Sequence, residues 1–410
     1  MAAEPSPLAL WNARGEVWRT PAGDLPTLSI PDAAALPDVL RAELPPGAWL
    51  LHDGGLGFGQ RGTLHVRLTD GPEVTWPGGW SAHLPDVLPG ARPWQRPDWP
   101  EVATARVDAR LGALGLTRAG PVDPGFSHDL MGIHRVPLED GLRAWLKVSA
   151  DGREATLTTH LAAKHPDLLP PVLHADPQNA TLLTLDGGAL LDGVPDPAAW
   201  TGALERLASF QRAADDPALT DLGALTLTVP DMAARVDALL TDPAPLHAWR
   251  LNPDEVAALR DLRPAVAAAF RDLHAHGLPA GPAHGDAHPR NALHSPERGS
   301  VWFDWSEAAL AHPFMDAGWF LSFTLHPVRA ALPVRAGTPD LPEQLAGAYL
   351  RALEAGDAAG LLWRSLPLAH LHRAALFDAA YRNWTGTVPG IRPNFTPFSL
   401  RQALRESVRL

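Results

Sequence analysis

The feature that most constrains the fold is a polar segment at residues 283–291 (AHGDAHPRN), which stands a few positions ahead of an apolar run. Its glycine and proline predict a tight loop, and residues 301–303 predict a buried strand that ends at Asp304. Catalytic groups concentrate on loops that a rigid scaffold positions. We therefore expect this loop and strand to form the functional centre. The polar side chains that the loop presents are His284, Asp286, His288 and Asn291.

These residue types suit one kind of chemistry. An Asp and an Asn in one loop, with a second Asp after the next strand, form the set that phosphoryl transfer from ATP requires. Asp286 is then the group that orients an attacking hydroxyl and accepts its proton, while Asn291 and Asp304 hold Mg²⁺ against the triphosphate. His284 and His288 belong to the same catalytic loop, and we expect them to shape it rather than to transfer protons. Turn and cap formation alone does not explain such dense packing of these residue types ahead of a strand.

The motifs His-Gly-Asp-x-His-x-x-Asn, Phe-Asp-Trp and, at residues 312–316, His-Pro-Phe-Met-Asp follow one another in order. This order resembles the aminoglycoside phosphotransferase and choline kinase-like family. The resemblance implies an α+β, two-lobed protein-kinase-like fold with a small β-rich lobe and a large, mainly helical lobe. It also implies that Asp286 is the catalytic base and that Asn291 and Asp304 bind Mg²⁺. By the same resemblance, Asp316 helps to brace the catalytic loop.

Two charged residues of the expected small lobe are candidates for binding ATP. Lys147 lies in an apolar strand predicted at residues 144–148, and Glu154 lies near the start of the helix that follows. The resemblance implies that Glu154 pairs with Lys147 and that the lysine positions the α- and β-phosphates. The competing interpretations are a surface lysine and a glutamate that stabilises the first turn of a helix.

The rest of the nucleotide site is less clearly marked in the sequence. The protein-kinase motif Gly-x-Gly-x-x-Gly is absent from this region. The candidate phosphate ligand is Ser127, which lies in the turn before a strand predicted at residues 130–136. The alternative is that this turn is an ordinary hairpin turn. The strand at residues 181–185, with Leu183 and Leu185, leads into a hinge that we expect to hold adenine through backbone groups.

The chain has 410 residues, of which 46% are hydrophobic and 20% charged, so two or three domains are expected. We predict a small appended α+β domain at 1–95, a small lobe at 96–187 and a helical lobe at 188–410. Residues 1–95 resemble a degenerate Nudix-like segment without the acidic metal-binding helix, so we expect them to be dispensable for chemistry. Residues 88–100 predict a linker rich in Pro and Trp, and the glycine-rich residues 54–59 lack the following helix that a phosphate loop needs.

Charge and cysteine content exclude several classes of protein. The chain has 34 basic and 46 acidic residues, a formal net charge of −12, which disfavours general binding to nucleic acid or anionic membranes. Cysteine is absent, which excludes disulfides and Cys-ligated zinc. The N-terminus lacks a signal-like apolar region, and no apolar run approaches the roughly 18 residues of a membrane span. We expect a soluble cytoplasmic protein, and the sequence is silent on oligomeric state.

Further helix signals lie in the second half of the chain. Asn252 before Pro253 predicts a helix start, Pro264 a restart, and Gly277 a helix end. Polar side chains at residues 370–382 fall in one helical region, which borders the acceptor site in the family, but we interpret most of them as a solvated face. Residues 384–398, rich in proline and aromatic residues, are expected to pack irregularly.

Together these features predict an ATP- and Mg²⁺-dependent phosphotransferase that phosphorylates a hydroxyl of a small molecule. The rival of another class is a kinase-like pseudoenzyme that serves as a small-molecule or nucleotide-binding regulatory protein. The joint presence of Asp286, Asn291, Asp304 and Lys147 favours the enzyme. Asp-Trp in place of Asp-Phe-Gly favours small-molecule kinases over protein kinases. The sequence does not identify the acceptor.

Overall fold

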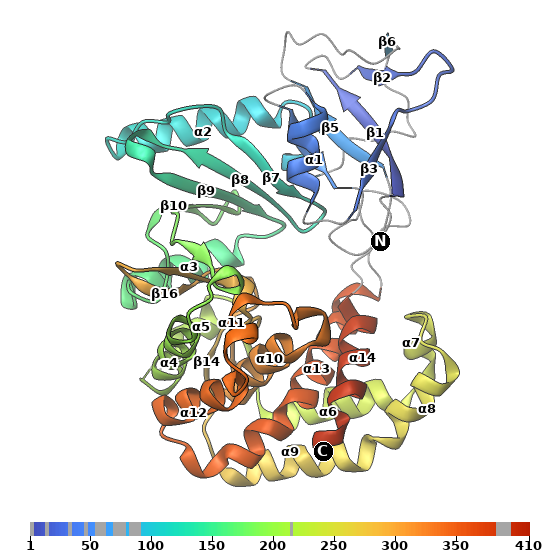
Figure 1. Ribbon diagram of the computed structural model, residues 1–410, viewed down its shortest axis with the longest axis vertical. Helices are drawn as coiled ribbons and strands as arrows, with labels where there is room; N and C mark the ends of the chain where they lie inside the picture. The colour runs from blue at the N-terminus through green and yellow to red at the C-terminus, as the bar shows by residue number, and fades with distance from the viewer. Residues whose placement is uncertain are drawn as a thin grey trace. The chain divides into compact units, whose positions relative to one another are not determined.

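The chain is described here from a computed structural model (Figure 1). The described residues form two compact units. The β-rich unit comprises the described residues of Met1–Ala155 and Val172–Asp186, and the helical unit comprises those of Thr156–Pro171, Gly187–Arg382 and Phe395–Leu410. The described residues are 4–12, 16–31, 35–44, 48–53, 63–68, 79–81, 92–213, 216–382 and 395–410.

The first sheet of the β-rich unit has the strand order β4-β5-β1-β2-β6, with β3 paired to β1. The strands are β1 (Glu4–Trp11), β2 (Val17–Arg19), β3 (Thr27–Ile30), β4 (Trp49–His52), β5 (Leu64–Arg67) and β6 (Gly79–Ser81). Strands β1 and β2 pair antiparallel, with Trp11 opposite Val17. Strands β1 and β5 are parallel, a pairing that local sequence signals could not predict. Helix α1 (Leu36–Glu43) packs Leu36 and Leu40 into the core of this sheet.

The second sheet of this unit is antiparallel and has the order β10-β11-β9-β8-β7. Its strands are β7 (Asp123–Ser127), β8 (Met131–Pro137), β9 (Arg143–Ser149), β10 (Val172–Asp176) and β11 (Thr181–Leu185). Along β9 the side chains alternate between a buried face, with Leu146 and Val148, and a partly exposed face, with Lys147. Helix α2 (Trp99–Ala113) lies across the sheet and buries its apolar face (Figure 1). Helix α3 (Arg153–Lys164) follows β9.

The domain boundary predicted at residue 95 does not separate compact units, because the described residues on both sides of it belong to the β-rich unit. Trp11 and Trp49 share one apolar cluster with Trp99 and Leu146 of the second sheet and its helix. Within the stretch predicted as a linker, Trp94 and its neighbour in the 3₁₀ helix η2 (Pro93–Gln95) are buried. The described part of residues 1–95 is therefore built into the β-rich unit. The glycine-rich residues 54–59 lie outside the described part of the chain.

Helices dominate the second unit, and they pack around one large apolar core (Figure 1). Trp200, Phe314, Phe320, Tyr349 and Leu366 are fully buried in it. The helices are α4 (Pro197–Ala213), α5 (Ala218–Asp221), α6 (Val229–Thr241), α7 (Pro243–Ala248), α8 (Pro253–Asp261), α9 (Arg263–His276), α10 (Phe314–Leu325), α11 (Pro333–Gly337), α12 (Leu341–Leu353), α13 (Ala359–Tyr381) and α14 (Phe395–Glu406). The predicted α+β class, with a small β-rich part and a large, mainly helical part, is confirmed.

Two short sheets of the helical unit frame the polar loop. One has the order β12-β15-β16 and the other the order β13-β17-β14. The loop lies between β14 and the 3₁₀ helix η5 (Pro289–Asn291), and the 3₁₀ helix η6 (Trp305–Glu307) follows β16. The strands are β12 (Ala189–Leu190), β13 (Leu225–Leu227), β14 (Gly281–Ala283), β15 (Ala292–Ser295), β16 (Gly299–Trp302) and β17 (Ala309–Ala311).

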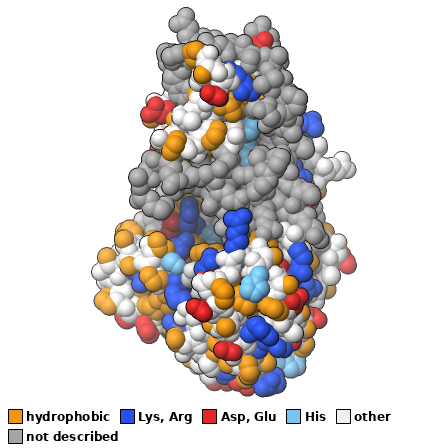
Figure 2. Space-filling model, turned by 90° about the vertical axis from the view of Figure 1, so that its right-hand side faces the viewer, with side chains coloured by type: hydrophobic (Ala, Val, Ile, Leu, Met, Phe, Trp, Pro, Cys, Tyr) orange, Lys and Arg blue, Asp and Glu red, His pale blue; other side chains and the backbone are white. Residues whose placement is uncertain are grey.

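Local signals set several helix ends as predicted. The Asn252 side chain accepts a hydrogen bond of 2.8 Å from the Glu255 N–H and begins α8, and Gly277, at φ +79°, ends α9. The expectation of irregular packing after residue 384 is wrong from Phe395 onward, because that segment is helix α14. Within the described residues, no helix has both the length and the apolar character to cross a membrane. Figure 2 shows basic side chains in several separate groups among acidic ones over the helical unit.

Candidate active site

The polar loop is held by a buried carboxylate at the start of α10. Asp316 accepts hydrogen bonds from the backbone N–H groups of His284, at 2.7 Å, and Gly285, at 2.9 Å. Gly285 has φ +83°, and a Cβ there would lie 2.0 Å from the Glu307 carbonyl oxygen. Only glycine fits such a position. Asp316 also accepts from Gln211 at 2.8 Å, so a buried network fixes the loop in place.

His284 is a structural residue of this loop. Its Nε2 atom lies 2.8 Å from the Phe303 carbonyl oxygen, and its Nδ1 atom accepts from the Asp286 N–H at 3.3 Å. These contacts place the proton on Nε2. Burial lowers the pKa of His284 to about 4, so the ring stays neutral. The ring joins the loop to the strand that precedes Asp304, which is the shaping role that we expected.

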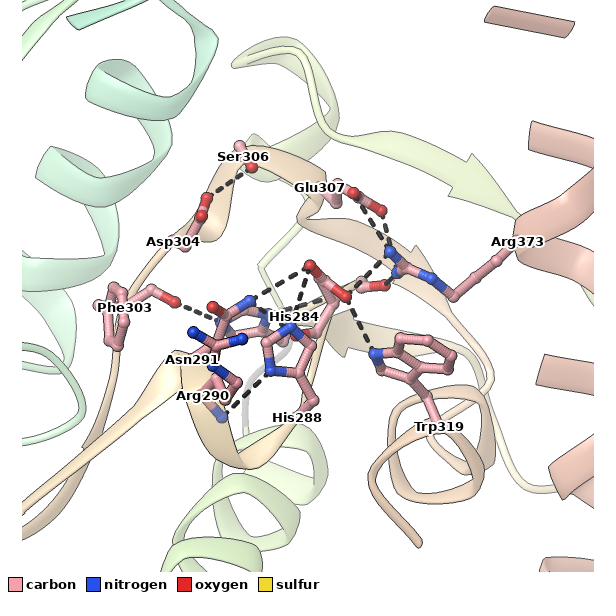
Figure 3. Close-up of polar contacts among 12 residues, drawn as sticks. His284, His288, Arg290, Asn291, Phe303, Asp304, Ser306, Glu307, Trp319 and Arg373 are labelled. Atoms are coloured by element: carbon pink, nitrogen blue, oxygen red, sulfur yellow. Dashed lines mark hydrogen bonds and ion pairs between the residues drawn. The ribbon is translucent and has the colours of Figure 1, made fainter. Parts of the chain in front are cut away.

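Asp286 contacts four side chains that Figure 3 labels: Trp319, Arg373, Asn291 and His288. Its Oδ1 atom accepts from Trp319 Nε1 at 2.9 Å and pairs with Arg373 at 2.9 Å. Its Oδ2 atom accepts from Asn291 Nδ2 at 3.2 Å and lies 3.6 Å from His288 Nε2. The carboxylate is 21% exposed. One oxygen is thus held by two strong donors, and the other has weaker contacts and can take a further donor.

The charge state of Asp286 follows from these partners. Burial acts to raise its pKa, but the Arg373 guanidinium and then His288 hold the pKa well below its ordinary value. The carboxylate is therefore ionised throughout the neutral range. A base of such low pKa takes up a proton weakly. The geometry suits Asp286 better to orienting a hydroxyl than to removing its proton early in the reaction.

The sequence analysis missed Arg373 and Glu307. Arg373 lies on α13 with 7% of its side chain exposed, and it contacts Glu307 at 3.0 Å as well as Asp286 (Figure 3). Its guanidinium also stacks on Trp319, at 4.6 Å from the ring centre. The interpretation of this helix as a solvated face is wrong, because α13 is surrounded by protein along most of its length. The other polar residues buried on α13 are Ser365, His370, His372 and Asp378.

Asn291 and Asp304 offer oxygen atoms suited to a hard cation. Asn291 donates through Nδ2 to the backbone oxygen of Asp286 at 3.0 Å, which leaves its amide oxygen as the ligand atom. Asp304 has the left-handed conformation, with φ +62°, and accepts from Ser306 Oγ at 2.7 Å. No cluster of three or more His, Cys, Asp or Glu ligands occurs among the described residues. A donor set of this kind fits Mg²⁺, which takes few protein ligands and completes its shell with phosphates and water.

In the β-rich unit, Lys147 and Glu154 form an ion pair. Lys147 Nζ lies 2.7 Å from Glu154 Oε1, and Ser149 Oγ donates to the other carboxylate oxygen at 3.0 Å. Glu154 is only 3% exposed, so the pair holds the lysine at a defined place on the partly exposed face of the sheet. Its role toward phosphates stays a prediction.

Ser127 does not fit the phosphate role that we expected. Its side chain is fully buried, and its hydroxyl donates to the Leu51 carbonyl oxygen at 2.6 Å. In addition, the Asp53 N–H donates to the Ser127 carbonyl oxygen at 2.8 Å, so the chain after β4 runs beside the end of β7. The sequence could not indicate that residues near position 50 would cover this turn.

Leu183 and Leu185 lie on β11, the strand that leads to the predicted hinge. In the pairing of β11 with β9, Leu182 lies opposite Lys147, while Leu183 lies opposite Leu146. Because side chains alternate along a strand, Leu183 and Leu185 share the buried face rather than the face of Lys147. Leu182 is therefore the leucine beside Lys147, and the binding of adenine by backbone groups of the hinge stays a prediction.

Comparisons with known proteins place the chain in a family. The chain belongs to the phosphotransferase enzyme family, whose model matches residues 138–366. This range contains Lys147, Glu154, the polar loop and Asp304 but not Arg373. The resemblance seen in the sequence is thus confirmed, while the Nudix-like resemblance of residues 1–95 stays a prediction. No curated protein matches the chain.

Several solved structures similar to the chain are described as kinases of small molecules. A choline/ethanolamine kinase family protein from Mesorhizobium loti is 16% identical, with 74% of this chain and 98% of that chain covered and a TM-score of 0.48. A putative fructosamine-3-kinase from Thermobifida fusca is 21% identical, with 74% and 99% covered and a TM-score of 0.47. A choline kinase from Streptococcus pneumoniae is 12% identical, with 75% and 100% covered and a TM-score of 0.48. No substrate follows from likenesses this low.

Proposed function

We propose that the protein transfers the γ-phosphoryl group of ATP, with Mg²⁺, to a hydroxyl of a small molecule. The observation that carries the proposal is the arrangement of Asp286, whose Oδ1 is held by Trp319 and Arg373 while Oδ2 has only the longer contacts with Asn291 and His288. An acceptor hydroxyl that donates to Oδ2 is aligned for attack. Membership of the phosphotransferase family supports the class of reaction.

In the proposed reaction the acceptor oxygen forms a bond to the γ-phosphorus atom. The bond between that phosphorus and the bridging oxygen of ADP breaks, and ADP leaves with the electron pair. The acceptor proton passes to Asp286 as the new bond forms and is then released to water. Mg²⁺, when bound by Asn291 and Asp304, neutralises charge on the phosphates. Lys147, held by Glu154, contacts the α- and β-phosphates.

Ser127 is buried, so the proposed phosphate site does not use its side chain. Backbone N–H groups bind phosphates without any particular side chain, so the turn after β7 does not require a serine ligand. A pseudoenzyme that binds nucleotide for regulation is the rival. The joint presence of Asp286, Asn291 and Asp304 with the Lys147–Glu154 pair favours turnover over this rival.

The test is a screen for ATP consumption over alcohols, sugars, amino sugars and hydroxy acids, with Mg²⁺ present or chelated. We expect acceptor-dependent release of ADP that stops when Mg²⁺ is chelated. Nucleotide binding without ADP release for any acceptor would instead support the pseudoenzyme. A cytoplasmic location is proposed on the same sequence grounds as above, and no nucleic-acid partner is proposed.

A further inference from the structure

Near the polar loop, one arginine has no counter-ion among the described residues. Arg329 ends the 3₁₀ helix η7 (Pro327–Arg329), is half-buried, and places its Cζ atom 3.2 Å from the ring centre of Phe323. No ion pair forms between it and any carboxylate in the described part of the chain. Nearby, Arg290 pairs with Asp192 at 3.5 Å, so that carboxylate is already engaged. A half-buried cation is costly without a partner.

Arg329 is linked to the catalytic loop through aromatic contacts. The His288 ring stacks on Phe323 with ring centres 4.6 Å apart and an angle of 10° between the planes. His288 Nε2 in turn lies 3.6 Å from the Asp286 carboxylate, and Trp319, one turn before Phe323 on α10, donates to the same carboxylate (Figure 3). Arg329 and His288 thus contact the same ring, that of Phe323. His288 also lies beside the Asp286 carboxylate, to which the acceptor hydroxyl is proposed to bind.

The surroundings of Arg329 carry an excess of positive charge. Burial, followed by the nearby Arg290, lowers the pKa of Arg329 to about 10, and Asp192 opposes this only in part. Burial, followed by Arg405 and Arg329, likewise lowers the pKa of His326 to about 4. Arg290 and Arg405 thus lie near Arg329 with Asp192 as the opposing carboxylate, a charge balance that a further anion would complete.

Resting on the proposed function, we propose that the acceptor carries a carboxylate or phosphate group that binds Arg329 while its hydroxyl binds Asp286. Arg373 cannot supply this contact, because Asp286 and Glu307 already neutralise it. A cationic acceptor would need a free carboxylate or an open aromatic face, yet Phe323 is already stacked by Arg329 and His288. The guanidinium fork suits planar carboxylates and phosphates.

The experiment compares matched sugars that differ in charge. Gluconate and glucose 6-phosphate are the anionic members, glucose is neutral and glucosamine is cationic, and each is assayed for ADP release with ATP and Mg²⁺. We expect the highest kcat/KM with an anionic member. Preference for glucose or glucosamine would overturn the inference.

Variants connect the preference to Arg329. Because a hydrogen-bonded charge pair is lost, Arg329→Gln should raise the KM for the anionic sugar by about 10- to 100-fold. The KM for ATP should stay unchanged, which separates acceptor binding from a contact with ATP. Arg329→Lys, which keeps the charge but loses the fork, should restore part of the affinity. Arg351→Gln is the matched control, since Arg351 lies exposed on α12. An unchanged acceptor KM in Arg329→Gln would reject the site.

A binding measurement separates this inference from the proposed function. If no sugar is phosphorylated, calorimetry with gluconate, glucose 6-phosphate and inorganic phosphate compares the wild-type protein with Arg329→Gln. Anion binding that occurs in the wild type and is lost in Arg329→Gln would support the anion site and reject the proposed transfer. Absence of anion binding in the wild type, or equal binding in both, overturns the anion site.

Discussion

Neighbouring residues hold one oxygen of the Asp286 carboxylate in place and leave the other with weaker contacts. Trp319 and Arg373 fix its Oδ1 atom at 2.9 Å each, and the backbone around it is held by Asp316 and the neutral His284. Little reorganisation is then needed when an acceptor hydroxyl reaches Oδ2. The same contacts that orient the carboxylate also lower its basicity, so we attribute its contribution to alignment and to accepting the proton late.

The first prediction concerns that carboxylate. Asp286→Asn keeps the size of the side chain but removes its charge, and kcat should fall by about 10²- to 10⁴-fold. The fold should persist, because Arg373 retains Glu307 as a partner. The measurements are kcat with the best acceptor and affinity for a non-hydrolysable ATP analogue, which should not change. Asp237→Asn, at an exposed pair with Arg263, is the control. A variant with near wild-type turnover would remove Asp286 from the mechanism.

Glu307 should give the reaction a pH dependence. Burial raises the pKa of Glu307 from 4.5 to about 7, with Arg373 opposing and Asp286 and Asp304 adding to the increase. Below that pH Glu307 is neutral and Arg373 pairs with Asp286 alone, which weakens Asp286 as a proton acceptor. Above it, the ionised Glu307 shares the guanidinium. We therefore expect kcat to rise with pH through about 7.

The matched variant is Glu307→Gln, which cannot ionise. It should remove the rise in kcat near neutral pH and keep the lower value throughout. The stability of the fold should change in the opposite direction to kcat, because it should fall as the pH rises. A group whose folded pKa is raised stabilises the fold fully below its ordinary pKa of 4.5, and this contribution is lost as pH rises through about 7. Urea unfolding at several pH values should show that decline in the wild type and a flatter profile in Glu307→Gln. Identical pH profiles of kcat would contradict the assignment.

Among the elements, the turn from β16 into η6 positions Asp304, the proposed metal ligand. Asp304 has φ +62° there, a conformation that Asp and Asn tolerate better than most residues. With Asn291 it offers too few ligands to bind Mg²⁺ tightly alone, so metal binding should depend on nucleotide. We expect calorimetry with a non-hydrolysable ATP analogue to show Mg²⁺ binding in the wild type and none in Asp304→Ala.

Alanine at that position is also strained, by about 1–3 kcal/mol. Asp304→Asn is therefore the companion variant, since it keeps the backbone preference and one neutral oxygen and should bind Mg²⁺ more weakly than the wild type. Thermal unfolding of both variants without nucleotide separates loss of the metal ligand from loss of the fold. Equal Mg²⁺ binding in all three proteins would mean that the metal lies elsewhere.

The elements also show what the sequence could and could not reveal. The polar loop, the Lys147 strand and the caps at Asn252 and Gly277 depend on neighbours in sequence, so local signals predicted them. Arg373 could not be assigned, because it meets Asp286 only through the packing of α13 against α10. One signal was present: helix α13 carries polar residues among leucines on all sides, which is typical of a helix surrounded by protein.

Pairing register was the other limit. The sequence predicted residues 181–185 as a strand, but only the pairing of β11 with β9 shows that Leu182 lies on the face of Lys147. A shift of one residue exchanges the two faces of a strand. The burial of Ser127 could not be predicted either, because Leu51, whose carbonyl oxygen accepts from the Ser127 hydroxyl, is far away in sequence. Long-range contacts, rather than weak local preferences, account for the errors in the predicted site.

At the scale of the whole molecule, the compact units do not follow chain order. The β-rich unit takes Val172–Asp186 after the chain has entered the helical unit at Thr156–Pro171. The N-terminal sheet shares its core with the sheet that carries Lys147. A division into three consecutive domains therefore does not describe how the described residues pack, and removal of an early segment should affect the sheet that carries Lys147.

The last prediction is that a chain beginning at Arg92 folds poorly in its β-rich part. Removal of residues 1–91 takes Trp11 and Trp49 from the cluster that contains Trp99. It also removes Leu51, the partner of the buried Ser127 hydroxyl. Each large-to-small change at a buried aromatic residue costs about 3–5 kcal/mol, and a buried polar group left without a partner costs about 1–3 kcal/mol. Urea unfolding should show an early transition or none for this part, with loss of nucleotide binding.

Two single substitutions in the intact chain provide reference values of the free energy of unfolding for comparison with the truncated chain. Trp49→Ala should lower the free energy of unfolding by about 3–5 kcal/mol, because Trp49 is 3% exposed and its ring packs 4.5 Å from that of His134. Arg41→Ala, at an exposed pair on α1, should change it by less than about 1 kcal/mol. If the truncated chain unfolds with the wild-type midpoint and binds nucleotide normally, residues 1–91 are a dispensable addition. The contacts of Leu51 and Trp49 would then contribute little to the small sheet.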